Sequence, residues 1–195
     1  MLELQPITLA SKRVRLRPLT LSDCPDLVDV ARDGRLWEIR TTTVPMPNDV
    51  ESYVRQALLN QNKSQELPFT ITLADGTIVG TTRYRDIDLD NDRLEIGSTW
   101  IAASYQKTFV NTHAKFLLLR HAFEDLLCIA VEFRADATNA MSRIALERLG
   151  AKQDGILRSH RKMSDGHIRD TAVYSIISSE WPEVKARFSQ NIDLV

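Results

Sequence analysis

Residues 94–119 constrain the fold of this chain more than any other segment, because a strand pattern there leads directly into an apolar helix pattern. Residues 94–101 alternate between two sets of side chains, which is the two-residue period of a strand with two different faces. After residues 106–112, apolar side chains recur at helical spacing in two stripes, Ala114, Leu117, Leu118, Ala122 and Phe116, Leu119, Phe123, Leu126. Such a helix is buried along most of its circumference, so its N-terminus is held rigidly at the end of the strand.

The rigid N-terminus of this helix predicts an anion site. The first turn of a helix has unpaired N–H groups and a partial positive charge, which favour a phosphate or a pyrophosphate. Glu95, on the strand just upstream, is a carboxylate that could accept a proton. The segment therefore indicates a phosphate-bearing cofactor that lies along a strand with a potential base.

Size and charge bound the class of protein. The chain has 195 residues, of which 43% are hydrophobic, so it can bury one substantial core, and we expect a single domain over residues 1–195. Its 25 basic and 26 acidic residues give a net charge of -1, so no bulk basic field attracts nucleic acid. We therefore expect no nucleic-acid partner.

The cysteines, the histidines and the N-terminus favour a cytoplasmic location. Cys24 and Cys128 lie far apart, which fits reduced thiols better than a disulfide framework. The four histidines form no zinc motif, so no metal is expected. The first ten residues have no basic start and apolar runs are short, so we expect neither a signal peptide nor a membrane partner.

Strand and helix patterns interleave along the rest of the chain. Strands are predicted at residues 13–19, 69–73, 77–85, 128–134, 158–163 and 168–177, with hairpin turns at Asp75-Gly76 and Asp165-Gly166. Helices are predicted from Ser22 or Asp23 to Asp33, from Asn48 or Asp49 to Asn62, and from Asn139 to Gly150. The fold class is therefore α+β (mixed α/β), built around one sheet.

A series of short strings resembles the GNAT acetyltransferase superfamily, specifically its RimJ/RimL-like branch. The strings are Leu16-Arg17-Pro18-Leu19 with Asp23, Leu94-Glu95-Ile96-Gly97, Asn139 with Ser142, Leu149-Gly150-Ala151, Asp165-Gly166 with Asp170, and Glu180-Trp181. Each is weak alone, but their order and spacing from about Arg13 to Phe188 are specific together. The resemblance implies the GNAT fold, with a single, mostly antiparallel twisted sheet whose central strands splay apart, flanked by helices.

The resemblance also implies that acetyl-CoA is the acyl donor. Its pyrophosphate would lie on the loop before the long helix, formed by Gln106, Lys107, Thr108, Phe109, Val110, Asn111 and Thr112. Its pantetheine arm would lie in the splay between strands 94–101 and 128–134, paired with the amides and carbonyls of Thr99 and Ile101 as a missing strand would be. Trp100, between them, is also expected in the cofactor site. In the family, the position of Asn139 lies near the pantetheine.

Two residues are expected to carry the chemistry. Glu95 falls where family members often place the general base, and Ser142 is the candidate acid because Leu146 occupies the position of the usual tyrosine. A thiol of pKa near 8.5 leaves readily, so losing the acid should cost less than losing the base. Purely structural roles remain alternatives for all three residues. Glu95 could be a solvated carboxylate on a strand, Ser142 a serine in the first turn of a helix, and Asn139 a helix cap.

Departures from the family leave alternatives open. Phe109 and Asn111 stand where the family has small residues, which allow close approach to phosphate and a positive φ. We expect CoA binding to persist if Phe109 points outward. A degenerate member that binds acyl-CoA without catalysis remains an alternative. Another is an adaptor that uses the basic run 158–162, which is otherwise a protected edge strand.

The acceptor is expected to be a primary amine, either a protein N-terminus or a small molecule. An α-amine of pKa about 8 is roughly one-tenth neutral at pH 7, whereas a lysine of pKa about 10.4 is neutral in fewer than about one molecule in a thousand. Residues 35–47 are too long and too rich in Trp37, Arg40 and threonines for a simple connector. In the family, the segment between the first two helices forms one wall of the acceptor cleft, so the resemblance implies that Trp37 and Arg40 face Tyr84 across it. The acceptor's identity, a larger acyl donor and a homodimer stay open.

Overall fold

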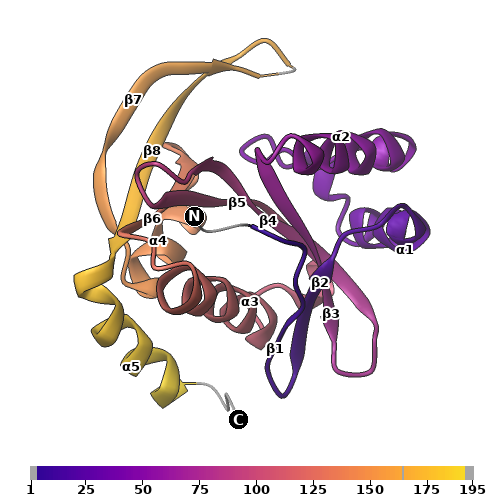
Figure 1. The fold of residues 1–195 in the computed structure, drawn as a ribbon. Helices are drawn as coiled ribbons and strands as arrows, with labels where there is room; N and C mark the ends of the chain where they lie inside the picture. The colour runs from indigo at the N-terminus through magenta and orange to yellow at the C-terminus, as the bar shows by residue number, and fades with distance from the viewer. Residues whose placement is uncertain (1–3, 164, 192–195) are drawn as a thin grey trace.

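The computed structural model describes residues 4–163 and 165–191, in which eight strands form one sheet (Figure 1). The strands are β1 (Leu9–Ala10), β2 (Val14–Pro18), β3 (Glu66–Leu73), β4 (Ile78–Asp88), β5 (Arg93–Ile101), β6 (Ala130–Asp136), β7 (Lys152–Lys162) and β8 (Ile168–Ile177). Their order in the sheet is β1-β2-β3-β4-β5-β6-β8-β7. The predicted basic run at residues 158–162 therefore lies on β7, at one edge of the sheet.

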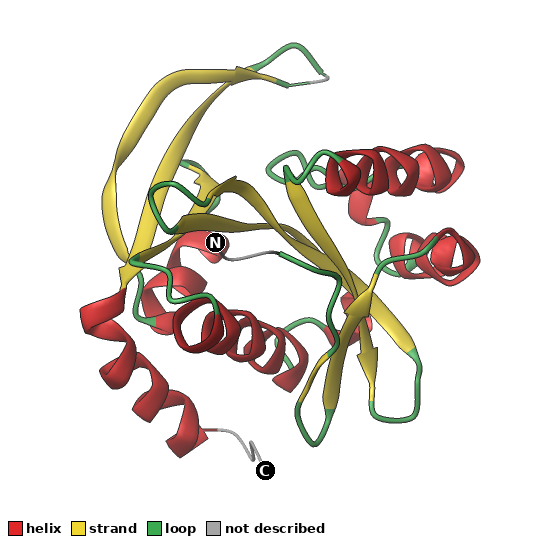
Figure 2. Ribbon diagram, in the orientation of Figure 1, coloured by secondary structure: helices red, strands yellow, loops and turns green. Residues whose placement is uncertain are grey.

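Helices cover both faces of this sheet (Figure 2). One face carries α1 (Cys24–Arg32) and α2 (Val50–Asn62), and the other carries α3 (Phe109–Arg120), α4 (Ala140–Leu149) and α5 (Trp181–Asn191). Each face has its own buried apolar cluster. Among the described residues, no helix is both long enough and apolar enough to cross a membrane. The predicted mixed architecture is confirmed.

The two central strands separate, and this opens a gap in the sheet. Every neighbouring pair is antiparallel except β5 and β6, which pair in parallel. That pairing covers only Arg93–Glu95 with Ala130–Glu132, although both strands continue beyond it. Because β5 stays paired with β4 and β6 stays paired with β8, the two halves of the sheet diverge. The predicted splay of the central strands is confirmed.

A β-bulge reverses the faces of β5 near its middle. Thr81 on β4 pairs with Trp100 and Arg83 pairs with Gly97, so β5 has one extra residue here. Ser98 has a positive φ of 47°. Ile96 packs in the cluster under α3, whereas Trp100 packs in the cluster under α1 and α2. The simple alternation predicted for residues 94–101 is therefore wrong beyond Gly97, because a bulge adds a residue and turns the strand.

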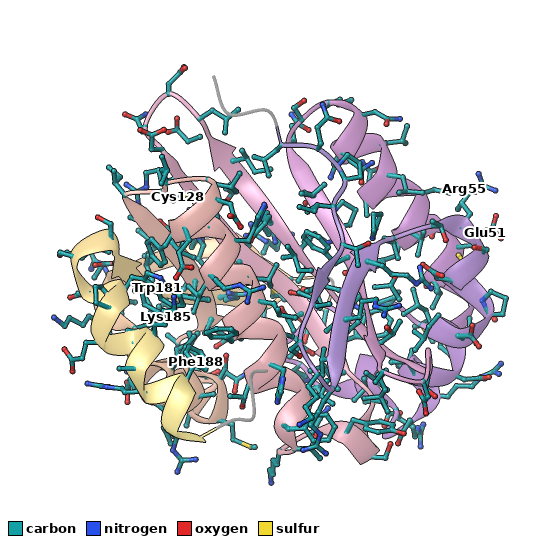
Figure 3. All side chains as sticks on the ribbon, turned by 60° about the horizontal axis from the view of Figure 1, so that its bottom comes forward. Glu51, Arg55, Cys128, Trp181, Lys185 and Phe188 are labelled. Carbon is teal, nitrogen blue, oxygen red and sulfur yellow. The ribbon has the colours of Figure 1, made fainter. Side chains whose placement is uncertain are left out.

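Several element boundaries also differ from the predictions. β1 and α5 were not predicted, β7 begins six residues before the predicted Arg158, and α3 ends at Arg120 in a π-helical turn, His121–Asp125. Figure 3 shows Trp181 and Phe188 on the side of α5 that faces α3. Their ring centroids lie 6.2 and 5.3 Å from that of Phe116. This aromatic packing fixes α5 against α3, and so supports the helix whose N-terminus meets β5.

Candidate active site

Glu95 lies at the point where β5 and β6 begin to separate. It pairs with Glu132 in the last register position of the parallel ladder, and its side chain is 4% exposed. A Cβ on Gly97 would overlap Glu95 Oε1, so the carboxylate lies over this glycine and shares its face. Gly97 pairs with Arg83, whose guanidinium lies 4.6 Å from the Tyr53 ring of α2. Glu95 is therefore on the α1–α2 face, and the Glu95-Ile96-Gly97 string has a steric reason.

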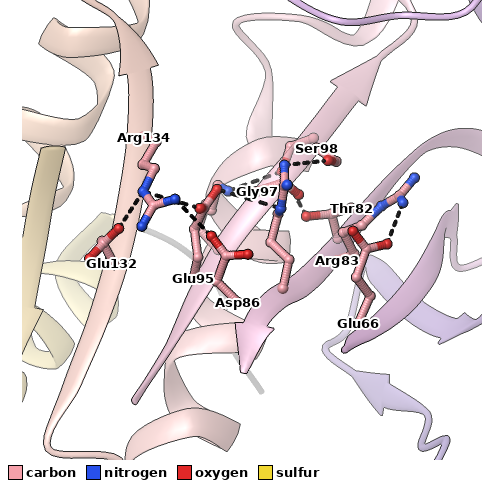
Figure 4. A network of polar contacts seen from close by, with 12 residues as sticks. Glu66, Thr82, Arg83, Asp86, Glu95, Gly97, Ser98, Glu132 and Arg134 are labelled. Carbon is pink, nitrogen blue, oxygen red and sulfur yellow. Dashed lines mark hydrogen bonds and ion pairs between the residues drawn. The ribbon is translucent and has the colours of Figure 1, made fainter. Parts of the chain in front are cut away.

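Two arginines flank the Glu95 carboxylate, and Figure 4 shows one of them, Arg134, beside it. Arg85 Nε lies 4.0 Å from Oε1, and Arg134 Nε lies 3.5 Å from Oε2. Arg134 also binds Asp86 at 2.7 Å and Glu132 at 2.5 Å, so three carboxylates share its charge. Burial outweighs both arginines and raises the pKa of Glu95 to about 7. A carboxylate with a pKa near neutrality suits a general base.

The N-terminus of α3 is built at the other end of β5. Thr108 is the N-cap, and its hydroxyl accepts a hydrogen bond from Val110 N at 3.3 Å and donates to Tyr105 O at 2.7 Å. The side chain of Gln106 donates to Ile101 O at 3.0 Å and ties the loop to the strand. The helix begins at Phe109, so Phe109–Thr112 form its first turn, which corrects their prediction as a loop. First-turn N–H groups in this place fit a phosphate.

Phe109 packs against Arg13 and His113 at the start of α3. Its ring lies 3.4 Å from the guanidinium carbon of Arg13 and 5.7 Å from the His113 ring, in a T-shaped contact. The positive φ of the loop, 58°, belongs to Lys107, while Phe109 and Asn111 have helical geometry. The bulky residue is therefore accommodated without a left-handed backbone.

The far half of β5 presents backbone groups to the splay. Ala102 N donates to Val79 O on β4, so the groups of Thr99 and Ile101 alternate toward the opposite side. Trp100 was predicted in the cofactor site, but its side chain packs on the α1–α2 face and donates to the Tyr53 hydroxyl at 3.2 Å. This part of the prediction is wrong for the Trp100 side chain, because the bulge turns it away. Val110 is likewise buried in the core.

Lys115 on α3 is a buried charged residue that the sequence analysis did not single out. Its Nζ donates to Thr99 Oγ1 at 3.1 Å and lies 5.4 Å from the Phe133 ring on β6, so it bridges the two splayed strands. Burial lowers its pKa to about 8, against the opposing effect of the Glu95 charge. The sequence pattern could have indicated this residue, because a lysine between Ala114 and Phe116 interrupts an otherwise apolar helix.

Asn139 and Ser142 meet at the N-terminus of α4. Asn139 Oδ1 accepts from Ser142 N at 3.0 Å, which is a helix cap. Asn139 Nδ2 also donates to Thr41 Oγ1 at 2.9 Å. Ser142 is half-buried, while Leu146 is buried among core residues. Asn139 therefore caps α4, and its contact with Thr41 connects this helix to the segment 35–47.

The segment 35–47 extends from the α1–α2 cluster to the turn between β7 and β8. Trp37 is half-buried against the α1–α2 cluster. Arg40 is exposed, and its Nε lies 3.6 Å from Asp165 Oδ2 in the turn between β7 and β8. Together with the Asn139 contact, this ties the segment to the N-terminus of α4 and to the turn between β7 and β8.

Tyr84 does not lie in an acceptor cleft, and its prediction there is wrong. Its side chain is 0% exposed on the α3 face, its hydroxyl donates to Leu118 O at 2.6 Å, and its ring stacks on His121 at 5.8 Å. On β4, Arg83 and Arg85 point to the other face, and Arg85 pairs with Glu95, so Tyr84 and Glu95 lie on opposite faces of the sheet.

Known proteins resemble this chain in sequence and in fold. The acetyltransferase (GNAT) domain model matches residues 13–152. YdaF of Bacillus subtilis (strain 168), named as a ribosomal N-acetyltransferase, is 32% identical over 109 residues. The alignment covers 56% of this chain and 58% of YdaF, so it spans a little over half of that relative's length.

Two solved structures extend the likeness over nearly the whole chain. One, described as an acetyltransferase from T. thermophilus, has a TM-score of 0.85 at 30% identity and covers 98% of this chain and 100% of that chain. Mycobacterium smegmatis RimJ, in complex with CoA-disulfide, has a TM-score of 0.80 at 22% identity and covers 94% and 93%, which shows a common fold. With the family model over residues 13–152, these findings show that the chain belongs to the GNAT acetyltransferase domain family, as its motifs predicted.

Proposed function

We propose that this protein is an N-acetyltransferase that transfers the acetyl group of acetyl-CoA to a primary amine, either a protein N-terminus or a small-molecule amine. The observation that carries the proposal is Glu95, a buried carboxylate with a pKa raised to about 7 where β5 and β6 separate. The name of YdaF, a ribosomal N-acetyltransferase, and the CoA derivative in the RimJ structure support it.

The residues around the splay fit acetyl-CoA. The edge of β5 offers the backbone groups of Thr99 and the amide of Ile101 to an amide-bearing arm, as strand addition does, while the Ile101 carbonyl accepts from Gln106. The first turn of α3 offers N–H groups to a pyrophosphate, and the exposed Lys107 adds a positive charge. When bound, acetyl-CoA supplies a thioester as the acyl donor and a thiol as the leaving group.

Glu95 accepts the proton of the attacking amine, directly or through a water. With a pKa of about 7 it is about half ionised at neutral pH, so it combines a populated base with useful proton affinity. An α-amine of pKa about 8 is already roughly one-tenth neutral at pH 7, so its deprotonation before attack costs little free energy. An α-amine is therefore the easier acceptor than a lysine side chain.

Segment 35–47 is the proposed acceptor wall. It is tied to the N-terminus of α4 by the contact of Thr41 with Asn139 and to the turn between β7 and β8 by the contact of Arg40 with Asp165. Trp37 gives this wall a rigid aromatic surface, because part of the ring is anchored in the α1–α2 cluster. We assign Trp37 and Arg40 to acceptor binding and remove Tyr84 from that role.

Thermal unfolding tests the donor site. CoA should raise the melting temperature, whereas pantetheine, which lacks the pyrophosphate, should raise it much less. Lys107→Glu should reduce the CoA shift, and Lys63→Glu at the end of α2 is the matched control that should preserve it. Equal shifts with CoA and pantetheine would remove the pyrophosphate site.

A thiol-release assay separates catalysis from binding alone. Peptides with free N-termini, polyamines and amino acids are offered together with acetyl-CoA, and free CoA thiol is measured. Release that depends on the amine and falls in Glu95→Gln supports the enzyme. A CoA-dependent rise in melting temperature without release for any amine would favour the degenerate acyl-CoA-binding protein.

A further inference from the structure

Lys115 is a buried cation whose position the proposed base and anion site leave unexplained. It lies within an apolar helix, beside the buried Ala114 and Phe116, and its residue is 9% exposed. A lysine is almost never buried to this extent unless it is paired. Its hydrogen-bond partner is the Thr99 hydroxyl, which carries no charge, and its ring neighbour is Phe133.

Among the residues that the structure describes, no ion pair offsets the cost of burying Lys115. An ammonium has three N–H donors, and a neutral hydroxyl accepts one of them. Thr99 itself is held by Thr82, with 2.7 Å between the two hydroxyl oxygens. A hydrophobic residue of similar length would pack in the apolar surroundings of α3 at lower cost. The position of Lys115 is therefore better suited to a ligand than to folding.

The location along α3 points to the reacting end of the donor. Lys115 is six residues after Phe109, about 9 Å along the helix axis from the proposed phosphate site. It bridges β5 and β6 across the splay, and it is close enough to Glu95 to feel that charge. Lys115 thus lies between the anion site and the base, on the α3 face, while the base is on the α1–α2 face.

We propose that Lys115 is a further catalytic residue, which contacts the CoA sulfur and stabilises the thiolate that leaves; this rests on the proposed function. The amine nitrogen forms a bond to the carbonyl carbon as the carbon–sulfur bond breaks. Glu95 takes the amine proton, and the electron pair of the broken bond goes to sulfur. Lys115 stays protonated and pairs with that charge, and the thiolate takes a proton from solvent as CoA departs.

This role explains how the chain manages without a tyrosine acid. The position where many family members carry that tyrosine is Leu146, which is buried in the core. Ser142 is a weak acid at best, whereas an ammonium beside a thiol lowers the thiol pKa. Lys115 projects from α3, so it would stabilise the leaving thiolate from the face of the sheet opposite to that of Glu95.

The test compares CoA with desulfo-CoA, which lacks the sulfur, and it does not require turnover. Dissociation constants are measured by calorimetry from pH 6 to pH 9 for the wild-type chain, Lys115→Met and Lys63→Met. If Lys115, whose own pKa is about 8, lowers the bound thiol pKa by one unit, CoA should bind about twice as tightly as desulfo-CoA near pH 8. The advantage should shrink toward pH 6, where the thiol stays neutral, and toward pH 9, where the lysine loses its charge. Lys63→Met should keep this advantage, and Lys115→Met should lose it.

The possible outcomes separate this proposal from the proposed function. Equal binding of CoA and desulfo-CoA by the wild-type chain at every pH would overturn the role of Lys115 and leave the donor site intact. An unchanged CoA advantage in Lys115→Met would overturn it as well. Failure of the wild-type chain to bind either compound would overturn both proposals.

A second variant and a kinetic readout guard against a folding defect. Melting curves verify that Lys115→Met and Lys115→Gln are folded, and both should lose the CoA advantage. In acetyl transfer, Lys115→Met should lower kcat about 10- to 100-fold with KM for the amine within about twofold. Its pH profile should lose the decline above about pH 8 that deprotonation of Lys115 causes in the wild-type enzyme. A retained decline would contradict the assignment.

Discussion

The two faces of the sheet each bury one charged group beside the splay, but the groups that surround the charge differ between the faces. On the α1–α2 face, Glu95 has guanidinium groups of Arg85 and Arg134 within 4.0 Å. On the α3 face, Lys115 contacts the Thr99 hydroxyl and the Phe133 ring, and no carboxylate of the described residues lies within ion-pair distance of it. The two arginines favour the carboxylate of Glu95 against its burial, and the charge of Glu95 favours the ammonium of Lys115 against its burial.

In both places burial moves the pKa toward neutrality. It raises the pKa of Glu95 to about 7 and lowers that of Lys115 to about 8. Each group therefore costs folding free energy when it is charged. Two buried charges that lower stability are typical of a functional site. The role of each face can be tested by removing the charged side chain on that face.

Removing the base should have the largest effect on the reaction. Glu95→Gln keeps the shape of the side chain but accepts no proton, so kcat should fall by about two to four orders of magnitude. CoA affinity should stay nearly unchanged, because the anion site lies at the other end of β5. Steady-state kinetics and calorimetry measure the two quantities. Full activity of this variant would show that another group accepts the proton and would break the comparison of the two faces.

The same variant should be more stable than the wild-type chain. The pKa of Glu95 is raised from 4.5 to about 7 on folding, so the folded state is penalised as pH rises through this window. Glu95→Gln should raise the free energy of unfolding by about 3 kcal/mol above pH 7 and by less than about 1 kcal/mol at pH 5. Urea unfolding at the two pH values measures the difference. A gain that does not grow with pH would show that Glu95 is not penalised by burial.

Much of this arrangement could be predicted from residues 94–119. The apolar stripes of α3 indicated a rigid helix, and its rigid N-terminus indicated the anion site, because both depend on local pattern and helix geometry. The splay and the family followed from the order of short motifs. The spacing of Trp181, Val184 and Phe188 is also that of one face of a helix, so the pattern could have predicted α5 as well.

The face assignments depended on information that lies outside local pattern. The bulge at Ser98 comes from the pairing of β5 with β4, so residues 94–101 do not reveal that Trp100 turns away from Ile96. Tyr84 was misplaced because its face depends on the position of α3. Lys115 was visible as a charge in an apolar helix, but its meeting with Thr99 and Phe133 depends on the tertiary packing.

On the acceptor face, changes in segment 35–47 should alter recognition of the amine. Trp37→Ala or Arg40→Ala should raise KM for the acceptor several-fold and leave KM for acetyl-CoA within about twofold. Because Trp37 is half-buried in the α1–α2 cluster, a melting curve must show that its variant is folded. Arg40 is exposed, so its variant is the cleaner probe. Unaltered acceptor kinetics in a folded variant would move the search to the hairpin around Asp165.

The smallest effect is expected at Ser142, the acid predicted from the sequence. Its amide is engaged in the Asn139 cap, and this backbone contact survives replacement of the side chain. Since a thiol of pKa near 8.5 leaves without much help, and Lys115 is placed for the leaving group, Ser142→Ala should lower kcat by less than about tenfold. The ratio of CoA to desulfo-CoA affinity should stay at the wild-type value. A larger loss of kcat than in Lys115→Met would place the leaving-group partner on α4 rather than on α3.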